Sequence, residues 1–267
     1  MTSLNTLMSL NGRRAIVTGA NGNLGRVIVS TLAELGADVI LVDLPGKQMQ
    51  VFADETSETW SVKTQCLACD LESESDRNVL ISEVKGSALG VDVLVNNAAF
   101  VGDSNLTGWI DNFEEQSLET WRRAIEVNLT SAFHLCQALT PDLKKSDGGS
   151  IINIASIYGQ YGPDWRLYEG ANMGNPAAYG ASKGGLIQLT RWLATTIAPD
   201  VRVNSISPGG IYRGQPKEFV SKYSNRTPLG RMAVEDDFKG AVAFLSSDLS
   251  AYVTGQILRV DGGWGEW

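Results

Sequence analysis

The chain has 267 residues, of which 43% are apolar, and carries 22 Lys and Arg against 30 Asp and Glu, a net charge of −8. This length fits one large α/β domain or two small ones, and the acidity without a basic block argues against nucleic acid or an anionic membrane as a partner. No apolar run approaches the roughly 18 residues that span a membrane. Residues 1–11 lack the basic and apolar segments of a secretory signal, so we expect a cytoplasmic enzyme.

A glycine-rich turn follows the first predicted strand. Arg14–Thr18 is short and apolar, Gly19-Ala-Asn-Gly-Asn-Leu-Gly25 comes next, and a helical run extends from Arg26 to Leu35. Strand, glycine turn and helix is the context of a dinucleotide-binding fingerprint, in which a pyrophosphate approaches the backbone and the helix N-terminus. An ordinary strand-to-helix turn is the alternative, because a glycine motif alone is weak support.

An acid ends the second predicted strand, Ala37–Asp43. Asp43 comes 18 residues after Gly25, close to the roughly 20 expected for the carboxylate that binds an adenosine ribose. It would repel a 2′-phosphate, and no Arg directly follows it, so the sequence favours NAD over NADP. The alternative is a helix-capping or turn Asp before Pro45.

The cysteines and the single histidine predict no metal site. Cys66 and Cys69 lie in the β-like run Val62–Cys69, where residues three apart face opposite sides of a sheet. We expect them to be reduced and packed. His134 falls in a helical pattern, and a lone histidine argues against a Ser-His-Asp triad or a His-based metal site.

Strands and helices alternate along the whole chain without a linker or repeat. This order predicts one Rossmann-type domain over residues 1–267, a doubly wound parallel sheet of about seven strands with helices on both faces. Residues 157–176 are predicted as an insert in the substrate region and residues 212–231 as a basic lid over the substrate. The later predicted elements are helix Ser75–Ala88, strand Val91–Val95, helix Ser117–Leu143, strand Ser150–Ser156, helix Ala177–Ala198, strand Val201–Ser207, helix Asp236–Leu245 and strand Gln256–Val260.

Asparagines occupy positions where a strand or helix would not favour them. Asn96 and Asn97 end the fourth predicted strand, so they are expected to brace loops or to touch a ligand. Asn128 lies in the middle of a predicted helix, where Asn is a poor former. Its side chain either forms hydrogen bonds where two elements pack together, or it braces the backbone or binds a water beside the site.

Tyr179 and Lys183 are four residues apart at the start of a predicted helix and so share one helix face. The ammonium should lower the pKa of the phenol below its usual value of about 10, which would suit Tyr179 to proton transfer near neutral pH. Ser156 ends a predicted strand, and ligands bind at the carboxyl ends of such strands. A chance pattern on a solvated helix is the alternative for the Tyr and Lys pair.

Together these motifs resemble the short-chain dehydrogenase/reductase family over roughly residues 11–263. The resemblance implies that Tyr179 is the general acid and base, and that Lys183 adjusts its pKa and binds a ribose of the cofactor. It also implies that Ser156 hydrogen-bonds the reacting oxygen and that Asn128 holds a proton-relay water. It also implies adenine contacts from Asp70 and Leu71 and a nicotinamide contact from Ile211. The motif residues are Thr18, Gly19, Gly25, Asp70, Asn96 to Ala99, Asn128, Ser156, Tyr179, Lys183, Pro208, Gly209 and Asp261 to Gly263. The predicted NAD-binding set is Gly19, Asn21, Gly22, Asn23, Leu24, Gly25, Asp43, Asp70, Leu71, Asn97, Ala98, Tyr179, Lys183, Pro208, Gly209 and Ile211.

Two departures from the family pattern bear on function. Asn23 stands where the family usually has Gly, and we expect it to tolerate a left-handed backbone. Ser156 and Tyr179 are 23 residues apart, more than is usual, which defines the insert. The insert and the tail Trp264–Trp267 resemble a bacterial subgroup associated with flagellin and surface-sugar modification.

The expected activity is NAD-dependent interconversion of a secondary alcohol and a ketone on a polar, sugar-like small molecule, with phosphorylated or nucleotide-linked forms included. The alternatives are a 3-oxoacyl carrier-protein reductase and a protein that senses NAD without turnover. Helices Ser117–Leu143 and Ala177–Ala198 carry apolar residues on more than one face. This pattern, together with the family likeness, predicts a symmetric homotetramer or a dimer.

Overall fold

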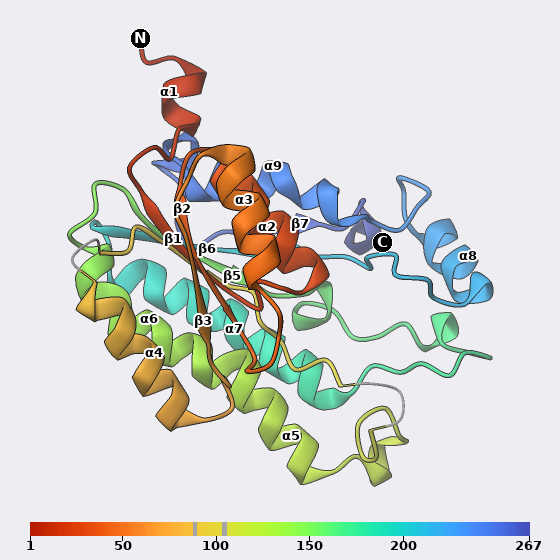
Figure 1. The fold of residues 1–267 in the computed structure, drawn as a ribbon. Coiled ribbons are helices and arrows are strands. Elements are labelled where there is room, and N and C mark those ends of the chain that lie inside the picture. Colours follow the sequence, from red (N-terminus) through yellow and green to blue (C-terminus); the bar gives the residue numbers. More distant parts are fainter. Residues whose placement is uncertain (88–89, 103–105) are drawn as a thin grey trace.

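The computed structural model describes residues 1–87, 90–102 and 106–267. Its strands form one parallel sheet of seven strands in the order β3-β2-β1-β4-β5-β6-β7 (Figure 1). The strands are β1 (Arg14–Thr18), β2 (Asp38–Asp43), β3 (Thr64–Ala68), β4 (Val93–Asn96), β5 (Gly149–Ile154), β6 (Val201–Pro208) and β7 (Ile257–Val260). The predicted Rossmann-type, doubly wound fold is confirmed.

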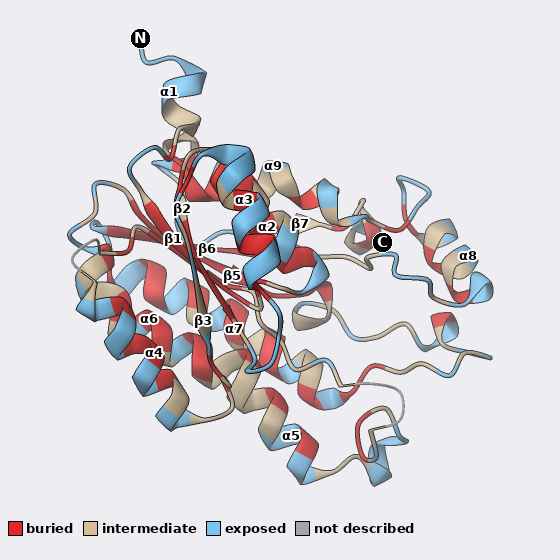
Figure 2. Cartoon of the chain, viewed as in Figure 1, coloured by how far each residue is buried: buried red, intermediate tan, exposed pale blue. Residues whose placement is uncertain are grey.

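Helices cover both faces of the sheet because its strands are apolar on both sides. Neighbouring residues of β1 divide between two cores: Val17 packs toward one face and Ile16 toward the other. Figure 2 shows the resulting burial along the central strands. One face is covered by α2 (Asn23–Glu34), α3 (Gln50–Trp60) and α9 (Lys239–Ser246), and the other by α4 (Glu74–Gly86), α6 (Ser131–Leu143) and α7 (Ala177–Thr196).

The strand order reverses at β1, which lies between β2 and β4. The connections that leave β1 and β4 therefore diverge to opposite faces and leave a crevice at the carboxyl edge of the sheet. The turn after β1, Asn97 after β4, Ser156 after β5 and Gly209 after β6 all lie at this edge. The fold thus gathers the predicted motifs at the place where such sheets bind ligands.

The predicted helix Ser117–Leu143 is interrupted. It consists of α5 (Leu118–Ile125), a π-helical turn over Glu126–Thr130, and α6. The Ser117 hydroxyl caps its start by accepting the backbone N–H of Thr120 at 3.1 Å. Asn128 lies in the π turn, a type of distortion that recurs at functional sites.

Among the described residues, three α-helices were not predicted from the sequence: α1 (Leu4–Met8), α3 and α8 (Lys217–Arg226), the last of which lies in the segment predicted only as a lid. In α3 only three residues are buried, so its apolar pattern is weak, and α1 spans just five residues. One predicted boundary lies outside the described residues. The predicted helix Ser75–Ala88 ends at Ala88, which lies outside the described residues. Cys66 and Cys69 pack against opposite faces of the sheet, as predicted.

The insert and the lid pack together beside the carboxyl edge. Buried side chains from residues 157–176 meet the lid helix α8 (Lys217–Arg226) and the C-terminal Trp264 in one aromatic cluster. An ion pair of 2.8 Å joins Arg226 to Asp164, which links the lid to the insert. Figure 1 shows α8 and the insert on the same side of the molecule.

Candidate active site

A cavity of about 830 Å³ follows the carboxyl edge of the sheet from the end of β2 to the start of α7. This volume lies in the upper part of the usual range for cofactor sites, about 300–1,000 Å³. Every residue of the predicted cofactor set except Gly25 lines this cavity, which we call the main cavity. Ser156, Tyr179 and Lys183 also line it, whereas Asn128 does not.

The glycine turn brings the N-terminus of α2 to the main cavity. Gly19 has a left-handed φ of 64°, and a Cβ there would come within 2.9 Å of the Ala98 backbone. A Cβ at Gly25 would come within 2.0 Å of the Gly19 carbonyl oxygen, so this glycine allows close packing and does not line the cavity. Gly22 caps α2 without a side-chain hydrogen bond, which leaves the first N–H groups of the helix available for a pyrophosphate.

Asn23 does not adopt the backbone conformation that the sequence suggested. It is the first residue of α2, with the right-handed conformation of the helix, and Ser61 is the one non-glycine residue of positive φ among those described. The tolerance of Asn for left-handed backbone is therefore not needed here. Asn23 lines the main cavity as an ordinary first-turn residue.

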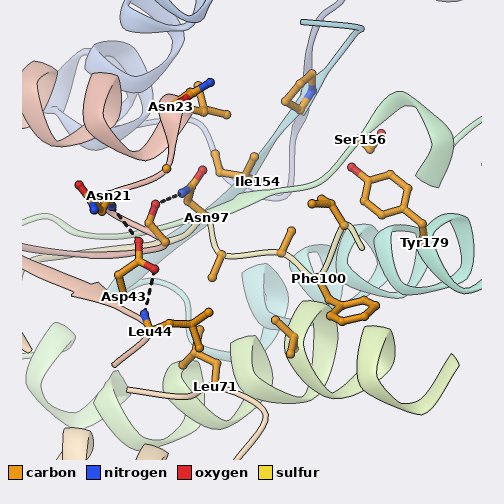
Figure 3. Close-up of a pocket in the computed structure, with 18 of the residues that line it drawn as sticks. Asn21, Asn23, Asp43, Leu44, Leu71, Asn97, Phe100, Ile154, Ser156 and Tyr179 are labelled. Carbon is orange, nitrogen blue, oxygen red and sulfur yellow. Dashed lines mark hydrogen bonds between the residues drawn. The ribbon is translucent and has the colours of Figure 1, made fainter. Parts of the chain in front are cut away.

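Asp43 acts at the same time as a turn residue and as part of the cavity wall. Its Oδ2 accepts the backbone N–H of Asn21 and its Oδ1 accepts that of Leu44, each at 2.8 Å (Figure 3). Each carboxylate oxygen has a further lone pair for a ribose hydroxyl. The two interpretations that the sequence left open are therefore compatible.

The asparagines mainly brace the site. Asn97 lines the main cavity and donates its amide to the carbonyls of Thr18 and Gly19 at 2.9 and 3.0 Å, which ties the loop after β4 to the glycine turn. Asn128 is buried: its Oδ1 accepts the backbone N–H of Phe100 at 2.6 Å, and its amide donates to the Ser182 hydroxyl at 3.0 Å. Its side chain is thus a backbone brace, and the proton-relay water remains a prediction.

Ser156, Tyr179 and Lys183 meet where β5 ends and α7 begins. Figure 3 shows the hydroxyl of Tyr179 pointing toward Ser156. The Lys183 ammonium donates to the carbonyl of Ile154 at 2.7 Å and lies 5.9 Å from the centre of the Tyr179 ring. Both side chains therefore point into the cavity from one face of α7, as their four-residue spacing predicted.

The predicted effect of Lys183 on the acidity of Tyr179 is wrong for this structure. Burial raises the pKa of Tyr179 above its usual value, while a hydrogen-bonding interaction with Ser156 and the positive charge of Arg213 act in the opposite direction. Burial also lowers the pKa of Lys183, to about 8. Sequence spacing alone could not reveal how strongly burial acts on both groups.

The low pKa of Lys183 predicts a pH-dependent stability. Below about pH 8 the amine is charged in both the folded and the unfolded chain, and burial of that charge costs about 3 kcal/mol, taken from the shift from 10.5 to about 8. Between these two values only the unfolded chain holds the proton, so stability should rise with pH. Burial raises the pKa of Cys69 and Cys136, which lowers the stability of both proteins as pH rises above the usual thiol pKa. We therefore expect urea unfolding from pH 7 to 10.5 to show a rising stability of the wild type relative to Lys183→Met. Equal pH slopes in the two proteins would contradict it.

Several residues of the main cavity were not predicted. Leu44 and Phe100 directly follow predicted strand-end motifs, so adjacency to those motifs could have found them. Lys47, Arg123 and Arg213 reach the cavity only through the tertiary fold. Arg123 is held there by an ion pair of 3.0 Å with Glu72, and Arg213 by one of 3.1 Å with Glu235.

A second cavity, of about 330 Å³, adjoins the main cavity. The two share Val101 and Tyr179, so Tyr179 lies in the wall of both. Most of the wall of the second cavity comes from the insert. The described lining residues are Val101, Gly102, Trp109, Ile110, Tyr158, Tyr168, Asn172, Met173, Gly174, Asn175, Pro176 and Tyr179.

Comparisons with known proteins agree with this geometry. A family model described as enoyl-(acyl carrier protein) reductase matches residues 19–265. The 3-oxoacyl-acyl-carrier-protein reductase FabG of Aquifex aeolicus is 33% identical over 96% of this chain and 98% of its own. Among solved structures, an NAD⁺-bound xylitol dehydrogenase is 30% identical over 95% of this chain and 99% of its own, with a TM-score of 0.83. A gluconate 5-dehydrogenase from Burkholderia cenocepacia, in complex with NADP and tartrate, is 25% identical over 99% of this chain and 100% of its own, with a TM-score of 0.87.

The chain belongs to the short-chain dehydrogenase/reductase family. It is accordingly an oxidoreductase that acts on CH–OH groups with a nicotinamide cofactor. The residues that line the main cavity fit such a cofactor, with free N–H groups at the start of α2 and the Asp43 carboxylate at the end of β2. Within residues 1–87, 90–102 and 106–267, no helix is long and apolar enough to cross a membrane.

Proposed function

We propose that this protein uses NAD to interconvert a secondary alcohol and a ketone on an uncharged, sugar-like substrate. The observation that carries the proposal is the position of Tyr179 in the wall shared by the two cavities. A cofactor in the main cavity and a substrate in the second cavity would meet at this phenol. Ser156 lies beside it and supplies a second hydroxyl at the same point.

The residues at this point fit the following chemistry. A bound nicotinamide ring would accept or supply the hydride. In oxidation, Tyr179 as phenolate, a form that Ser156 and the charge of Arg213 favour against the effect of burial, takes the proton of the substrate hydroxyl. Ser156 donates a hydrogen bond to the same substrate oxygen. In reduction, Tyr179 returns the proton to the carbonyl oxygen. Lys183, held by the Ile154 carbonyl, supplies positive charge next to the phenol.

The charges of the lid favour an uncharged substrate over a phosphorylated one. Its basic side chains largely pair with acidic neighbours at 2.6–3.1 Å, so they are already compensated. These pairs are Arg213 with Glu235, Lys222 with Glu218, Arg226 with Asp164, and Arg231 with Asp237. A substrate phosphate would have to compete with these carboxylates.

A panel of assays tests the proposed function. NAD- and NADP-linked turnover would be measured with polyols, sugar acids, sugar nucleotides and 3-oxoacyl thioesters. We expect NAD-linked oxidation of polyols or sugars to give the highest kcat/KM. Preferential reduction of the acyl thioester would instead support the carrier-protein reductase, which the likeness to FabG favours. Cofactor binding without turnover of any substrate would support the sensing protein.

We also propose a symmetric homotetramer or dimer. Trp121 on α5, Phe133 on α6 and Trp192 on α7 are between 39% and 56% exposed although they are large and apolar. Subunit contacts would cover such side chains. Light scattering at micromolar concentration should give a mass of four or two chains, and Trp192→Glu should lower it. A monomeric wild type would refute the proposal.

A further inference from the structure

Two tyrosine hydroxyls and an amide form a polar group in the wall of the second cavity. The hydroxyls of Tyr158 and Tyr168 lie 2.7 Å apart. The buried amide of Asn175 lies close enough to both hydroxyls to oppose the rise in their pKa that burial causes. All three residues belong to the insert and line the second cavity, together with the catalytic phenol of Tyr179.

Apart from the amide of Asn172, the remaining described wall is apolar or aromatic. The indole N–H of Trp109 already donates to the Val101 carbonyl at 2.6 Å, so this residue presents ring surface to the cavity. Met173, Ile110 and Pro176 add apolar surface. None of the described residues that line this cavity is charged.

Packing holds the two tyrosines in place from behind. The ring of Tyr158 meets Trp264 edge-on at 6.1 Å between centroids, and the ring of Tyr168 meets Phe219 at 5.5 Å. Trp264 and Phe219 belong to the aromatic cluster that joins the insert, the lid helix α8 and the C-terminal segment. The hydroxyl pair is therefore preorganised and does not have to be ordered when a ligand binds.

We propose that Tyr158, Tyr168 and Asn175 determine substrate specificity by recognising hydroxyl groups of an uncharged polyol or sugar. This inference rests on the proposed function, since it assigns the substrate to the cavity next to Tyr179. One hydroxyl proton is used between the two tyrosines, which leaves one proton and several lone pairs for substrate hydroxyls. The aromatic walls suit the C–H faces of a carbohydrate.

None of the described residues that line the second cavity would compensate the charge of a bound carboxylate. Burial raises the pKa of both Tyr158 and Tyr168, so the surroundings already disfavour negative charge at this position. On the neighbouring wall of the main cavity, Arg213 is paired with Glu235, and the Lys183 ammonium donates to the Ile154 carbonyl. The site should accordingly distinguish a polyol from a sugar acid with the same hydroxyl groups.

Binding can be tested separately from turnover with the NADH-loaded protein. Titration calorimetry would compare D-sorbitol, D-gluconate and cyclohexanol on the wild type, on Tyr168→Phe and on Tyr161→Phe. Tyr161 belongs to the same insert but is absent from the wall of both cavities, so it provides a matched loss of one hydroxyl. D-sorbitol should bind the wild type at least tenfold more tightly than D-gluconate. Tyr168→Phe should weaken the binding of sorbitol about tenfold, the loss expected for one hydrogen bond. The affinity for cyclohexanol should stay unchanged.

Several outcomes would overturn the inference. These are tighter binding of D-gluconate than of D-sorbitol, undetectable binding of sorbitol, or equal effects of Tyr168→Phe and Tyr161→Phe. Tyr158→Phe serves as a second variant if Tyr168→Phe does not fold. Polyol binding that depends on Tyr168, in a protein that turns over no alcohol, would refute the proposed function and leave this inference standing.

Discussion

Tyr179→Phe is expected to lower kcat by a factor of about 10²–10⁴, the usual contribution of a positioned general acid or base. The substitution removes only the hydroxyl, which points toward Ser156, from a residue that lines both cavities. The ring remains, so the packing of α7 and the shape of the main cavity should persist. NADH binding, followed by nicotinamide fluorescence, should change by less than threefold.

A second tyrosine provides the control for this substitution. Tyr212 lies in the lid, is about half exposed and lines neither cavity, so Tyr212→Phe should retain wild-type kcat. Lys183→Ala should resemble Tyr179→Phe in turnover while retaining cofactor binding, because it removes the ammonium next to the phenol. If Tyr179→Phe turned over at a near-native rate, another group would be the acid and base, and the mechanism would have to be abandoned.

The sequence predicts the parts of the site that depend on local order. The glycine turn, Asp43 and Ser156 are each defined by a position at the end of an apolar strand, and the Tyr179 and Lys183 pair by helical spacing. Parallel strands in a doubly wound sheet bring their carboxyl ends to one edge, so these residues meet without further information. For that reason all of them line one cavity.

The parts that the sequence did not predict depend on tertiary packing. The π turn at Asn128 arises within a segment whose composition suggests a continuous helix. The direction of the pKa shift of Tyr179 follows from burial, which has no marker in the Tyr-x-x-x-Lys spacing. Arg213 and Lys47 reach the main cavity across loops whose paths no local pattern determines.

Among the cavity residues that the sequence did not predict, Lys47 bears most directly on the choice of cofactor. The sequence places it in a turn beyond Pro45 and Gly46, yet in the structure it lines the main cavity together with Asp43. At this end of the cavity, the Lys47 ammonium would attract a 2′-phosphate and the Asp43 carboxylate would repel it. The carboxylate is fixed by two backbone N–H groups, whereas the lysine side chain is exposed. We therefore expect Asp43 to dominate.

The wild-type protein is expected to prefer NAD over NADP by about a hundredfold or more in kcat/KM. Hydrogen bonds from ribose hydroxyls to the Asp43 carboxylate contribute about 1.5–3 kcal/mol each. A 2′-phosphate at the same position would meet like charge, at a cost of several kcal/mol, and each 1.4 kcal/mol corresponds to about a factor of ten. Kinetics with both cofactors at a fixed alcohol concentration would measure the ratio.

Asp43→Ala should reduce the preference for NAD over NADP at least about tenfold, because it weakens the binding of NAD and removes the repulsion of the 2′-phosphate of NADP. Lys47 would remain in the cavity wall with its positive charge. Adding Lys47→Ala should therefore weaken the binding of NADP again and leave that of NAD almost unchanged. Asp70→Ala is the matched control, because Asp70 is a carboxylate on the same wall that is expected beside the adenine, where both cofactors are alike. Asp70→Ala should change kcat/KM with NAD and kcat/KM with NADP by the same factor. Efficient use of NADP by the wild type, or an unchanged ratio in Asp43→Ala, would mean that Asp43 serves only the turn that it makes with Asn21 and Leu44.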